Sequence, residues 1–462
     1  MTGTRIYSPL DIGRRQFRLL QACLGDDGIL ECQLFVASLA DTDLQYQALS
    51  YVWGTAVASD MIRVDNQPFL VRLSLFDYLS YIAKEPKPKE YLGIFIDALC
   101  INQDDAAERS SQIALMGDIY SRAREVVVWF GSKDPWTDRV TYVYPVIEDA
   151  EVLRSCFDGV ENGLLDENEM REIREYMTQE LSEHEYWTRV WTVQEFLLPS
   201  RLQMRFGTMQ ISGLSFTKAV LGELSQEDQD LSFLNVAVPV KALFSEGNEF
   251  ISNVERCWQF VYERMKRDTD APPGTISQYQ KIPMSRAIIA FVEQQCLAPR
   301  DKTFGLLGIC SHRTVIDYIL PLSTLYLQVL VICLQELCTE PQGQEEMLLM
   351  VDVTIASSVS LEMPLNDDRV MVLTLLAMDT VGKAEFLMPF LLERTLPARR
   401  LHLHRLLLGP STVSKQRMTD IELRQLYQAI GMARDAESFV TTPDGETGTI
   451  EDWEAYLACL TN

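Results

Sequence analysis

Short apolar runs that end abruptly in polar or aromatic residues recur through the first half of the chain. The clearest are Tyr46–Val52, Leu92–Leu99 and Glu125–Gly131. The segment Ala106–Arg122, which lies between the second and third runs, has apolar residues at helical spacing. Apolar runs separated by a helix are typical of buried parallel strands with crossover connections. The pattern therefore predicts an α/β fold with a parallel sheet flanked by helices, and ligands bind such sheets at the carboxyl ends of the strands.

Other elements are expected around this core. They are an opening hairpin of Phe17–Leu20 and Ile29–Ser38, a second hairpin over Met61–Phe69 that turns at Asp65 and Asn66, a helix over Ser74–Lys84, and a fourth strand over Leu202–Phe206. Residues 132–185 read as an acidic insertion that contains an exposed helix at Asp166–Leu181. We expect a helical segment over 209–310 to close the first domain. Residues 311–462 are expected to be mainly helical, with an amphipathic helix at Ser323–Glu336.

Composition excludes several classes of function. The formal net charge of -25 argues against a nucleic-acid partner, because phosphate binding needs a clustered basic surface. The ten cysteines include no Cys-x-x-Cys pair, and the four histidines have no metal-ligand spacing. We therefore expect reduced thiols and no metal site, as in a cytoplasmic protein.

Three segments are candidates for an export signal, a membrane span and calcium binding, and none fits. The first residues lack a secretory signal, and the apolar stretch Tyr318–Leu337 is interrupted by Pro321, so it reads as a buried helix. The tail, Glu422–Ala433 followed by Thr442–Glu454, has the outline of a helix-loop-helix calcium hand. Two of its ligand positions fall on Pro443 and Gly445, which have no side-chain oxygen, so the tail is predicted to be a structural helical hairpin.

The segment Arg189–Glu195 contains the main candidate for a catalytic residue. Trp191 and Glu195 are four residues apart, so on a helix they share one face. An aromatic ring beside a carboxylate suits the binding and cleavage of a cationic ligand. Glu195 is the candidate catalytic residue, and the candidate substrate-binding residues are Tyr51, Trp53, Asp97, Asn102, Gln103, Arg189 and Trp191.

Each candidate also has a purely structural interpretation. A large apolar Trp191 fits core packing, and Glu195 could pair with Arg189 or Arg201 and do nothing else. The remaining alternatives are a loop cap for Asp97, loop formation for Asn102 and Gln103, and sealing of the sheet edge for Tyr51 and Trp53.

The motifs together resemble one known family. The boxes Ser50–Gly54, Ile96–Gln103 and Arg189–Glu195, with the run Glu108–Gly131, are similar to the fungal heterokaryon-incompatibility (HET) domain, and Pro299–Gly308 resembles its end. The resemblance covers about the first two thirds of the chain and implies a HET domain over residues 1–310. It also implies a role in non-self recognition and regulated cell death.

A second, more distant resemblance concerns Glu195. A buried Val-Val-Val-Trp-Phe strand, followed after an insertion by a Trp-x-x-x-Glu helix, resembles the Toll/interleukin-receptor (TIR) fold. It implies a TIR-like core at about residues 46–208, with Glu195 in the place of the glutamate that hydrolyses NAD in some branches of that fold. The chemistry is consistent, because nicotinamide leaves as a neutral molecule without a general acid. No glycine-rich phosphate loop is present, so loop amides or cations such as Arg189 would hold the diphosphate.

Three hypotheses for function remain open at this stage. The first is NAD glycohydrolysis at Glu195, with NAD as substrate rather than cofactor, switched on by self-association. The second is a non-enzymatic signalling or adaptor module that recruits a partner, and the third is base exchange or cyclisation of a related nucleotide. An allele-specific protein is a candidate partner, and whether the chain acts alone stays open.

Overall fold

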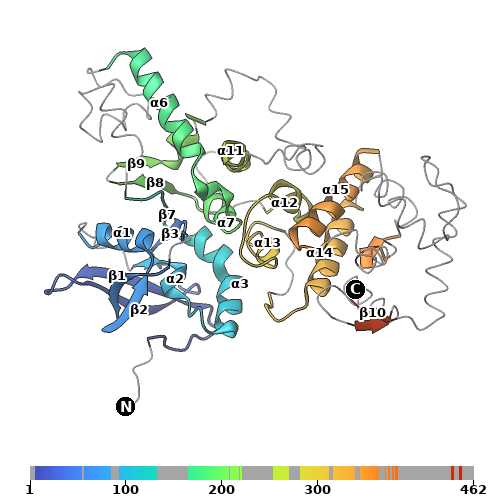
Figure 1. The fold of residues 1–462 in the computed structure, drawn as a ribbon, viewed down its shortest axis with the longest axis horizontal. Helices are drawn as coiled ribbons and strands as arrows, with labels where there is room; N and C mark the ends of the chain where they lie inside the picture. The colour runs from blue at the N-terminus through green and yellow to red at the C-terminus, as the bar shows by residue number, and fades with distance from the viewer. Residues whose placement is uncertain are drawn as a thin grey trace, which may run out of the picture. The chain divides into compact units, whose positions relative to one another are not determined.

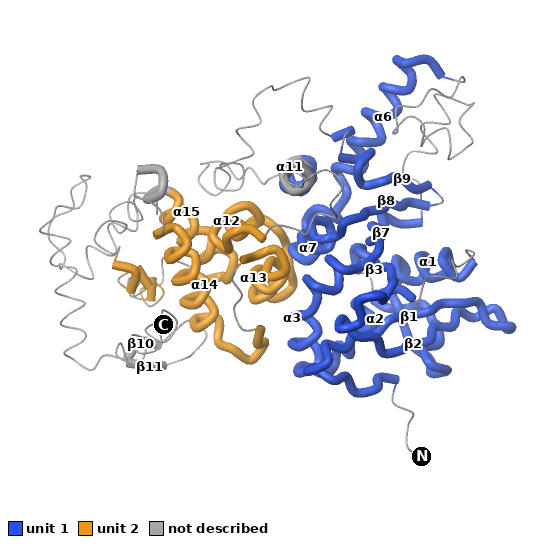
Figure 2. The backbone as a smooth tube through the Cα atoms, turned by 180° about the vertical axis from the view of Figure 1, so that it is seen from behind, with its two compact units in different colours: residues 1–235, 251–280 blue, residues 236–250, 281–462 orange. Residues whose placement is uncertain are grey.

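The chain divides into two compact units (Figure 2). The first comprises residues 1–235 and 251–280, and the second comprises residues 236–250 and 281–462. The computed structural model describes residues 6–54, 57–84, 93–132, 165–207, 209–217, 219–220, 253–269, 281–311, 316–338, 344–363, 370, 373–374, 377–378, 380–382, 439–441 and 447–449. The domain boundary that the sequence suggests at residue 310 is a different division and stays a prediction.

The first unit is built on a nine-stranded sheet with the order β5-β4-β2-β1-β6-β3-β7-β8-β9 (Figure 1). The strands are β1 (Gln16–Leu24), β2 (Leu30–Ser38), β3 (Gln47–Tyr51), β4 (Asp60–Val64), β5 (Gln67–Val71), β6 (Ile94–Phe95), β7 (Glu125–Trp129), β8 (Leu202–Phe206) and β9 (Met209–Ser212). The central strands β6, β3, β7 and β8 pair in parallel. Antiparallel pairs add β1 beside β6 and β9 beside β8. The expected α/β fold is confirmed, and antiparallel strands extend its parallel centre on both sides.

The order of the parallel strands locates the place where a ligand is expected. These four strands follow one another along the chain as β3, β6, β7 and β8. Across the sheet their order is β6-β3-β7-β8, which is 2-1-3-4 in chain numbering. This is the beginning of the flavodoxin-type doubly wound order, in which the direction of winding reverses between the first and third strands. That switch point here lies between the carboxyl ends of β3 and β7.

Helices lie on both faces of this sheet. They are α1 (Leu73–Ile82), α2 (Asp97–Cys100), α3 (Ala106–Arg122), α6 (Glu167–Ser182), the 3-10 turn η1 (Glu185–Thr188), α7 (Thr192–Leu197) and α11 (Asn253–Thr269). Tyr51 and Trp129 are register partners, so both face one side, and Trp129 packs there on Tyr78 of α1 at 5.4 Å between ring centroids. The opposite face carries Ser50, which contacts α7, and Tyr46, which donates to a carbonyl of α3.

The two predicted hairpins and the predicted helix over Ala106–Arg122 are confirmed. β1 and β2 form the opening hairpin, and β4 and β5 form the second. Asp65 and Asn66 have φ values of 47° and 63°, the left-handed conformation that a two-residue hairpin turn requires. The helix α3 begins after Asp105, whose carboxylate accepts the N–H groups of Ala107 and Glu108.

Several sequence expectations were wrong in part. The second core strand, expected over Leu92–Leu99, is only Ile94–Phe95, because Asp97–Cys100 turns into the helix α2. Residues 209–212 form β9 and not the start of a helical segment. Helix α6 buries one face, including Ile173 and Met177, instead of standing exposed.

The second unit contains the helices α12 (Met284–Ala290), α13 (Asp301–Phe304), α14 (Leu322–Leu337) and α15 (Gln344–Ser360). Helix α14 confirms the helix predicted at Ser323–Glu336, but its amphipathic character was wrong, because most of its residues are buried and none is exposed. The Glu336 carboxylate accepts the N–H groups of Met284 and Ser285, both at 2.9 Å, and so caps the N-terminus of α12. In the tail, β10 (Phe439–Thr441) pairs antiparallel with β11 (Thr447–Thr449), so residues 447–449 are a strand within a segment expected to belong to a helical hairpin. The rest of that expected hairpin lies outside the described residues. Within the described parts of the chain, no helix is long and apolar enough to cross a membrane.

Candidate functional site

Glu195 lies in the first unit, at the face of the sheet that carries α7. Its side chain is buried, with 4% of the residue exposed. The Ser50 hydroxyl at the end of β3 donates to the Glu195 carboxylate at 2.5 Å, and the Tyr186 hydroxyl lies 2.7 Å from the same Ser50 oxygen. Because the hydroxyl hydrogen of Ser50 is used in the hydrogen bond to Glu195, the Tyr186 hydroxyl is the donor in the hydrogen bond between Tyr186 and Ser50. The three side chains therefore form one hydrogen-bonded chain, from η1 through β3 to α7.

Burial changes the protonation of this carboxyl. Desolvation, reinforced by the negative charge of Asp97, raises the pKa of Glu195 to about 8, while Arg189 and the Ser50 hydrogen bond act in the opposite direction. Within the described residues, Glu195 has no ion-pair partner within 4.0 Å, so the structural alternative of a salt bridge with Arg189 or Arg201 is not formed. Near neutral pH the group is mostly protonated, and a cation bound beside it would favour the carboxylate.

Asp97 begins α2 next to the carboxyl end of β6. Its carboxylate accepts the backbone N–H of Ala98 at 2.7 Å and the indole N–H of Trp53 at 3.3 Å. Burial raises the pKa of Asp97, and the charge of Arg189 is the largest influence that lowers it. The contact with Ala98 agrees with the capping alternative, and a contact with substrate stays a prediction.

Two arginine side chains lie close to the ring of Trp53. The guanidinium carbons of Arg72 and Arg189 lie 5.6 and 5.9 Å from the centre of its ring. Arg72 donates to the carbonyl of Gly54 at 2.7 Å, and Arg189 donates to the carbonyl of Tyr51 at 2.8 Å. Trp53 therefore orients two arginines and Asp97 at the end of β3. A contact between the Trp53 ring and substrate stays a prediction.

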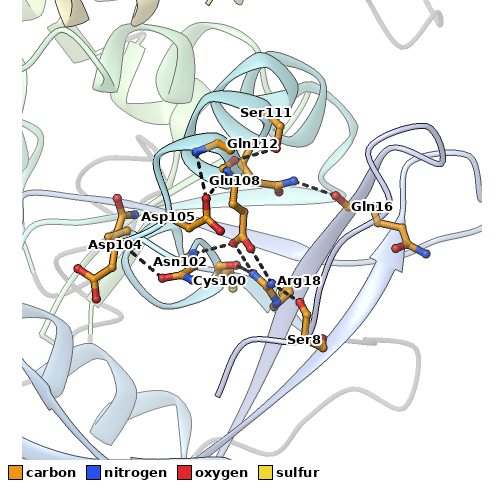
Figure 3. Close-up of polar contacts among 12 residues, drawn as sticks. Ser8, Gln16, Arg18, Cys100, Asn102, Asp104, Asp105, Glu108, Ser111 and Gln112 are labelled. Atoms are coloured by element: carbon orange, nitrogen blue, oxygen red, sulfur yellow. Dashed lines mark hydrogen bonds and ion pairs between the residues drawn. The ribbon is translucent and has the colours of Figure 1, made fainter. Parts of the chain in front are cut away.

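Asn102 and Gln103 shape the loop after α2. Gln103 donates its amide N–H to the carbonyl of Asp97 at 3.0 Å, and the backbone N–H of Asn102 binds the Glu108 carboxylate at 2.8 Å. Glu108 also forms two hydrogen bonds with the buried guanidinium of Arg18, at 2.6 and 2.9 Å (Figure 3). These contacts agree with loop formation, which was the structural alternative for both residues.

Trp191 comes immediately before α7 with helical backbone angles, and the N–H of Glu195 binds its carbonyl at 3.5 Å. The expected spacing of the two residues over one helical turn is thus observed. Trp191 is half-buried, whereas Glu195 faces the core. The far end of α7 is held by Arg264 of α11, which donates to the carbonyl of Phe196 at 2.5 Å.

Three residues of this site were absent from the sequence-based candidates. Ser50 lies in the first box, and strand alternation places its side chain on the face opposite Tyr51. Arg72 follows the second hairpin, and Tyr186 precedes the Arg189–Glu195 segment, where no local pattern marks either residue as functional. Among the described residues, no cluster of three or more histidines, cysteines, aspartates or glutamates could hold a metal ion.

A segment in the first half of the chain, which contains this site, is similar to a known family. Residues 46–195 match the family model described as "Heterokaryon incompatibility protein (HET)". The "Heterokaryon incompatibility protein 6, OR allele" of Neurospora crassa is 37% identical to this chain over 129 residues, which is 26% of this chain and 18% of that protein. The chain thus matches less than a fifth of this relative's length. No solved structure gives a significant match.

Proposed function

We propose that this chain is a heterokaryon-incompatibility effector that triggers regulated cell death by cleaving NAD to nicotinamide and ADP-ribose at Glu195. The incompatibility role is supported by the HET match over residues 46–195 and by the Neurospora crassa relative, whose name refers to one allele. The enzymatic part rests on one observation, which is the buried Glu195 carboxyl that accepts a hydrogen bond from Ser50, itself bound to Tyr186, beside the switch point of the sheet. The distant TIR resemblance and the strand order agree with this assignment.

The reaction needs few groups. The bond between the ribose C1′ atom and the pyridinium nitrogen breaks, and its electron pair moves to the nitrogen, so nicotinamide leaves uncharged. The ribose becomes an oxocarbenium ion, which the Glu195 carboxylate stabilises. Water then attacks C1′ and transfers its proton to Glu195. Arg189, which is held at the end of β3, would balance the negative diphosphate.

A non-enzymatic signalling module is the alternative. The same burial favours it, because only 4% of Glu195 is exposed and its carboxyl already has a hydrogen-bond donor. Mass spectrometry of nucleotides after incubation of concentrated protein with NAD separates the two functions. Release of nicotinamide supports the enzyme, and NAD left intact supports the adaptor. The ratio of ADP-ribose to cyclic product then distinguishes hydrolysis from cyclisation.

Substitution of Trp53 tests the arginine arrangement. We expect Trp53→Ala to weaken NAD binding about tenfold, because the two guanidiniums lose an aromatic partner whose contacts are worth about 0.5–2 kcal/mol each. The loss of thermal stability should be small, since Trp53 is only half-buried. Calorimetric titration with NAD in a Glu195→Gln background measures affinity without turnover. A large fall in melting temperature at unchanged affinity would support the sheet-sealing alternative instead.

Activity is also expected to depend on protein concentration. An enzyme that depletes a cell of NAD must be inactive until it is triggered, and self-association supplies such a switch by mass action. Specific activity measured over a wide dilution series should therefore fall steeply on dilution. A constant specific activity in a monomer would contradict gating by assembly and would point to control by expression or by a separate inhibitor.

A further inference from the structure

A cleft of about 130 Å³ opens in the first unit beside the carboxyl end of β3. Its lining includes Tyr51, Trp53, Arg72, Leu75 and Ala98. Tyr51 is the last residue of β3, and Ala98 directly follows Asp97 in α2. The cleft thus lies next to the residues around Glu195, on the other side of the strand end, because Tyr51 and Ser50 face opposite sides of the sheet.

The size and the walls of the cleft fit one aromatic ring. Ala58, Phe69, Leu70, Val71 and Leu99 complete an apolar lining, and Leu70 is left 50% exposed to solvent. An apolar cavity of about 150 Å³ is known to hold a benzene molecule. A cleft of similar volume therefore has room for a single six-membered ring and is too small for a purine together with its sugar.

Two polar groups in the cleft are available for hydrogen bonding. Tyr51 is only 4% exposed, yet its hydroxyl forms no hydrogen bond with any residue that the structure describes. Arg72 carries five N–H donors, of which the described residues use one, in the bond to Gly54. The cleft therefore offers an acceptor and a donor beside an apolar slot, which is the complement of a carboxamide on a ring.

We propose that this cleft binds the nicotinamide ring, with Arg72 donating to the carboxamide oxygen and the Tyr51 hydroxyl accepting from its NH2 group. This inference deepens the proposed function and rests on it for the identity of the substrate. The general chemistry of the site is a single uncharged aromatic ring that bears a carboxamide.

The positive charge of Arg72 makes the cleft bind uncharged nicotinamide better than the positively charged pyridinium of NAD, and this difference assists the reaction. A guanidinium in the wall repels the positively charged pyridinium of NAD and attracts the carbonyl of uncharged nicotinamide. As the bond to the ribose breaks, the electron pair neutralises the ring, so the interaction becomes more favourable towards the transition state. Interactions that strengthen in this direction accelerate the reaction, whereas equal binding of substrate and transition state does not.

Binding of nicotinamide alone tests the proposal without turnover. Titration of the purified full chain, followed by saturation-transfer NMR, should show binding that Ala98→Leu weakens at least about tenfold, because the larger side chain fills the cleft. Ala58→Leu fills it from another lining position and should act in the same way. Ala114→Leu, on the exposed face of α3, is the matched control and should leave the affinity unchanged.

The polar contacts are tested by Tyr51→Phe, which removes only the hydroxyl. We expect it to weaken nicotinamide binding about three- to tenfold and to leave the binding of 3-methylpyridine, which lacks the carboxamide, unchanged. Thermal unfolding of each variant confirms that it is folded.

The proposal is overturned if the wild-type chain does not bind nicotinamide, or if both filled variants bind it as the wild type does. Failure of the proposed function gives a different pattern, in which nicotinamide binds in the cleft but NAD is not consumed. If NAD is consumed while the filled variants bind nicotinamide normally, the function stands and this assignment of the cleft is wrong.

Discussion

Replacing Glu195 with glutamine is expected to lower NAD turnover about a thousandfold while the fold is retained. Glutamine keeps the shape of the side chain and an oxygen that accepts the Ser50 hydroxyl, but it removes the negative charge that the oxocarbenium ion requires. Nicotinamide release, measured by mass spectrometry over time, gives the rate. Glu185→Gln changes an exposed glutamate in η1 and should have no effect. If Glu195→Gln consumes NAD at the wild-type rate, Glu195 is not the catalytic group.

The pH dependence provides an independent check on the same residue. Glu195 acts as a carboxylate, and its pKa in the free protein is about 8, so kcat/KM should rise about tenfold per pH unit below that value and level off above it. Stability should change in the opposite sense. A carboxyl whose pKa is raised on folding contributes stability at low pH and loses it as pH rises from the ordinary value of 4.5 to about 8.

Each pH unit within that window costs up to about 1.4 kcal/mol for one such group. Glutamine does not titrate, so the melting temperature of Glu195→Gln should equal that of the wild type near pH 5 and exceed it near pH 8. A variant that is less stable than the wild type at both values would mean that the substitution disturbs the hydrogen-bonded chain, and any loss of activity would then need a different explanation.

The parts of the fold that follow from local sequence were predictable. Strand β8 and helix α3 have the bounds that apolar spacing indicated, because their buried positions recur at regular intervals. The hairpin turn at Asp65 and Asn66 follows from residues that tolerate positive φ. Pairing between distant strands was not predictable in this way. The segment Asp97–Cys100 is as apolar as a strand, but it leaves the sheet as a helix.

The residues of the candidate site likewise include some that the sequence motifs identified and others that they did not. The three boxes identified residues that converge at the end of β3, such as Trp53 and Asp97, which lie 44 positions apart in the chain. Ser50, whose hydroxyl donates to Glu195, could not be identified from the residues next to Glu195, because the two are 145 positions apart in the chain. Tyr186, in η1, and Arg72, immediately before α1, were missed for another reason. A single tyrosine or arginine at such a position has no pattern that distinguishes a contact with the site from ordinary packing.

A second large effect is expected from Arg18→Met, which should destabilise the first unit by about 3–5 kcal/mol. Arg18 is 1% exposed, and its guanidinium binds both oxygens of Glu108, the carbonyl of Cys100 at 3.0 Å and the carbonyl of Ser8 (Figure 3). Methionine preserves much of the apolar volume but leaves the largely buried Glu108 carboxylate without its counter-charge. The cost should therefore exceed that of a surface ion pair severalfold.

Denaturant unfolding monitored by tryptophan fluorescence measures this loss, since Trp129 and Trp187 are buried in the same unit. Arg15→Met is the matched control, because the Arg15–Asp118 pair is partly exposed, with 43% and 32% of the two side chains accessible, and should cost less than about 1 kcal/mol. Glu108→Gln added to Arg18→Met removes the uncompensated charge and keeps an acceptor for Asn102, so the double variant should be more stable than Arg18→Met alone. Equal losses for Arg18→Met and Arg15→Met, or no recovery in the double variant, would show that the buried charge is not what holds β1, α2 and α3 together.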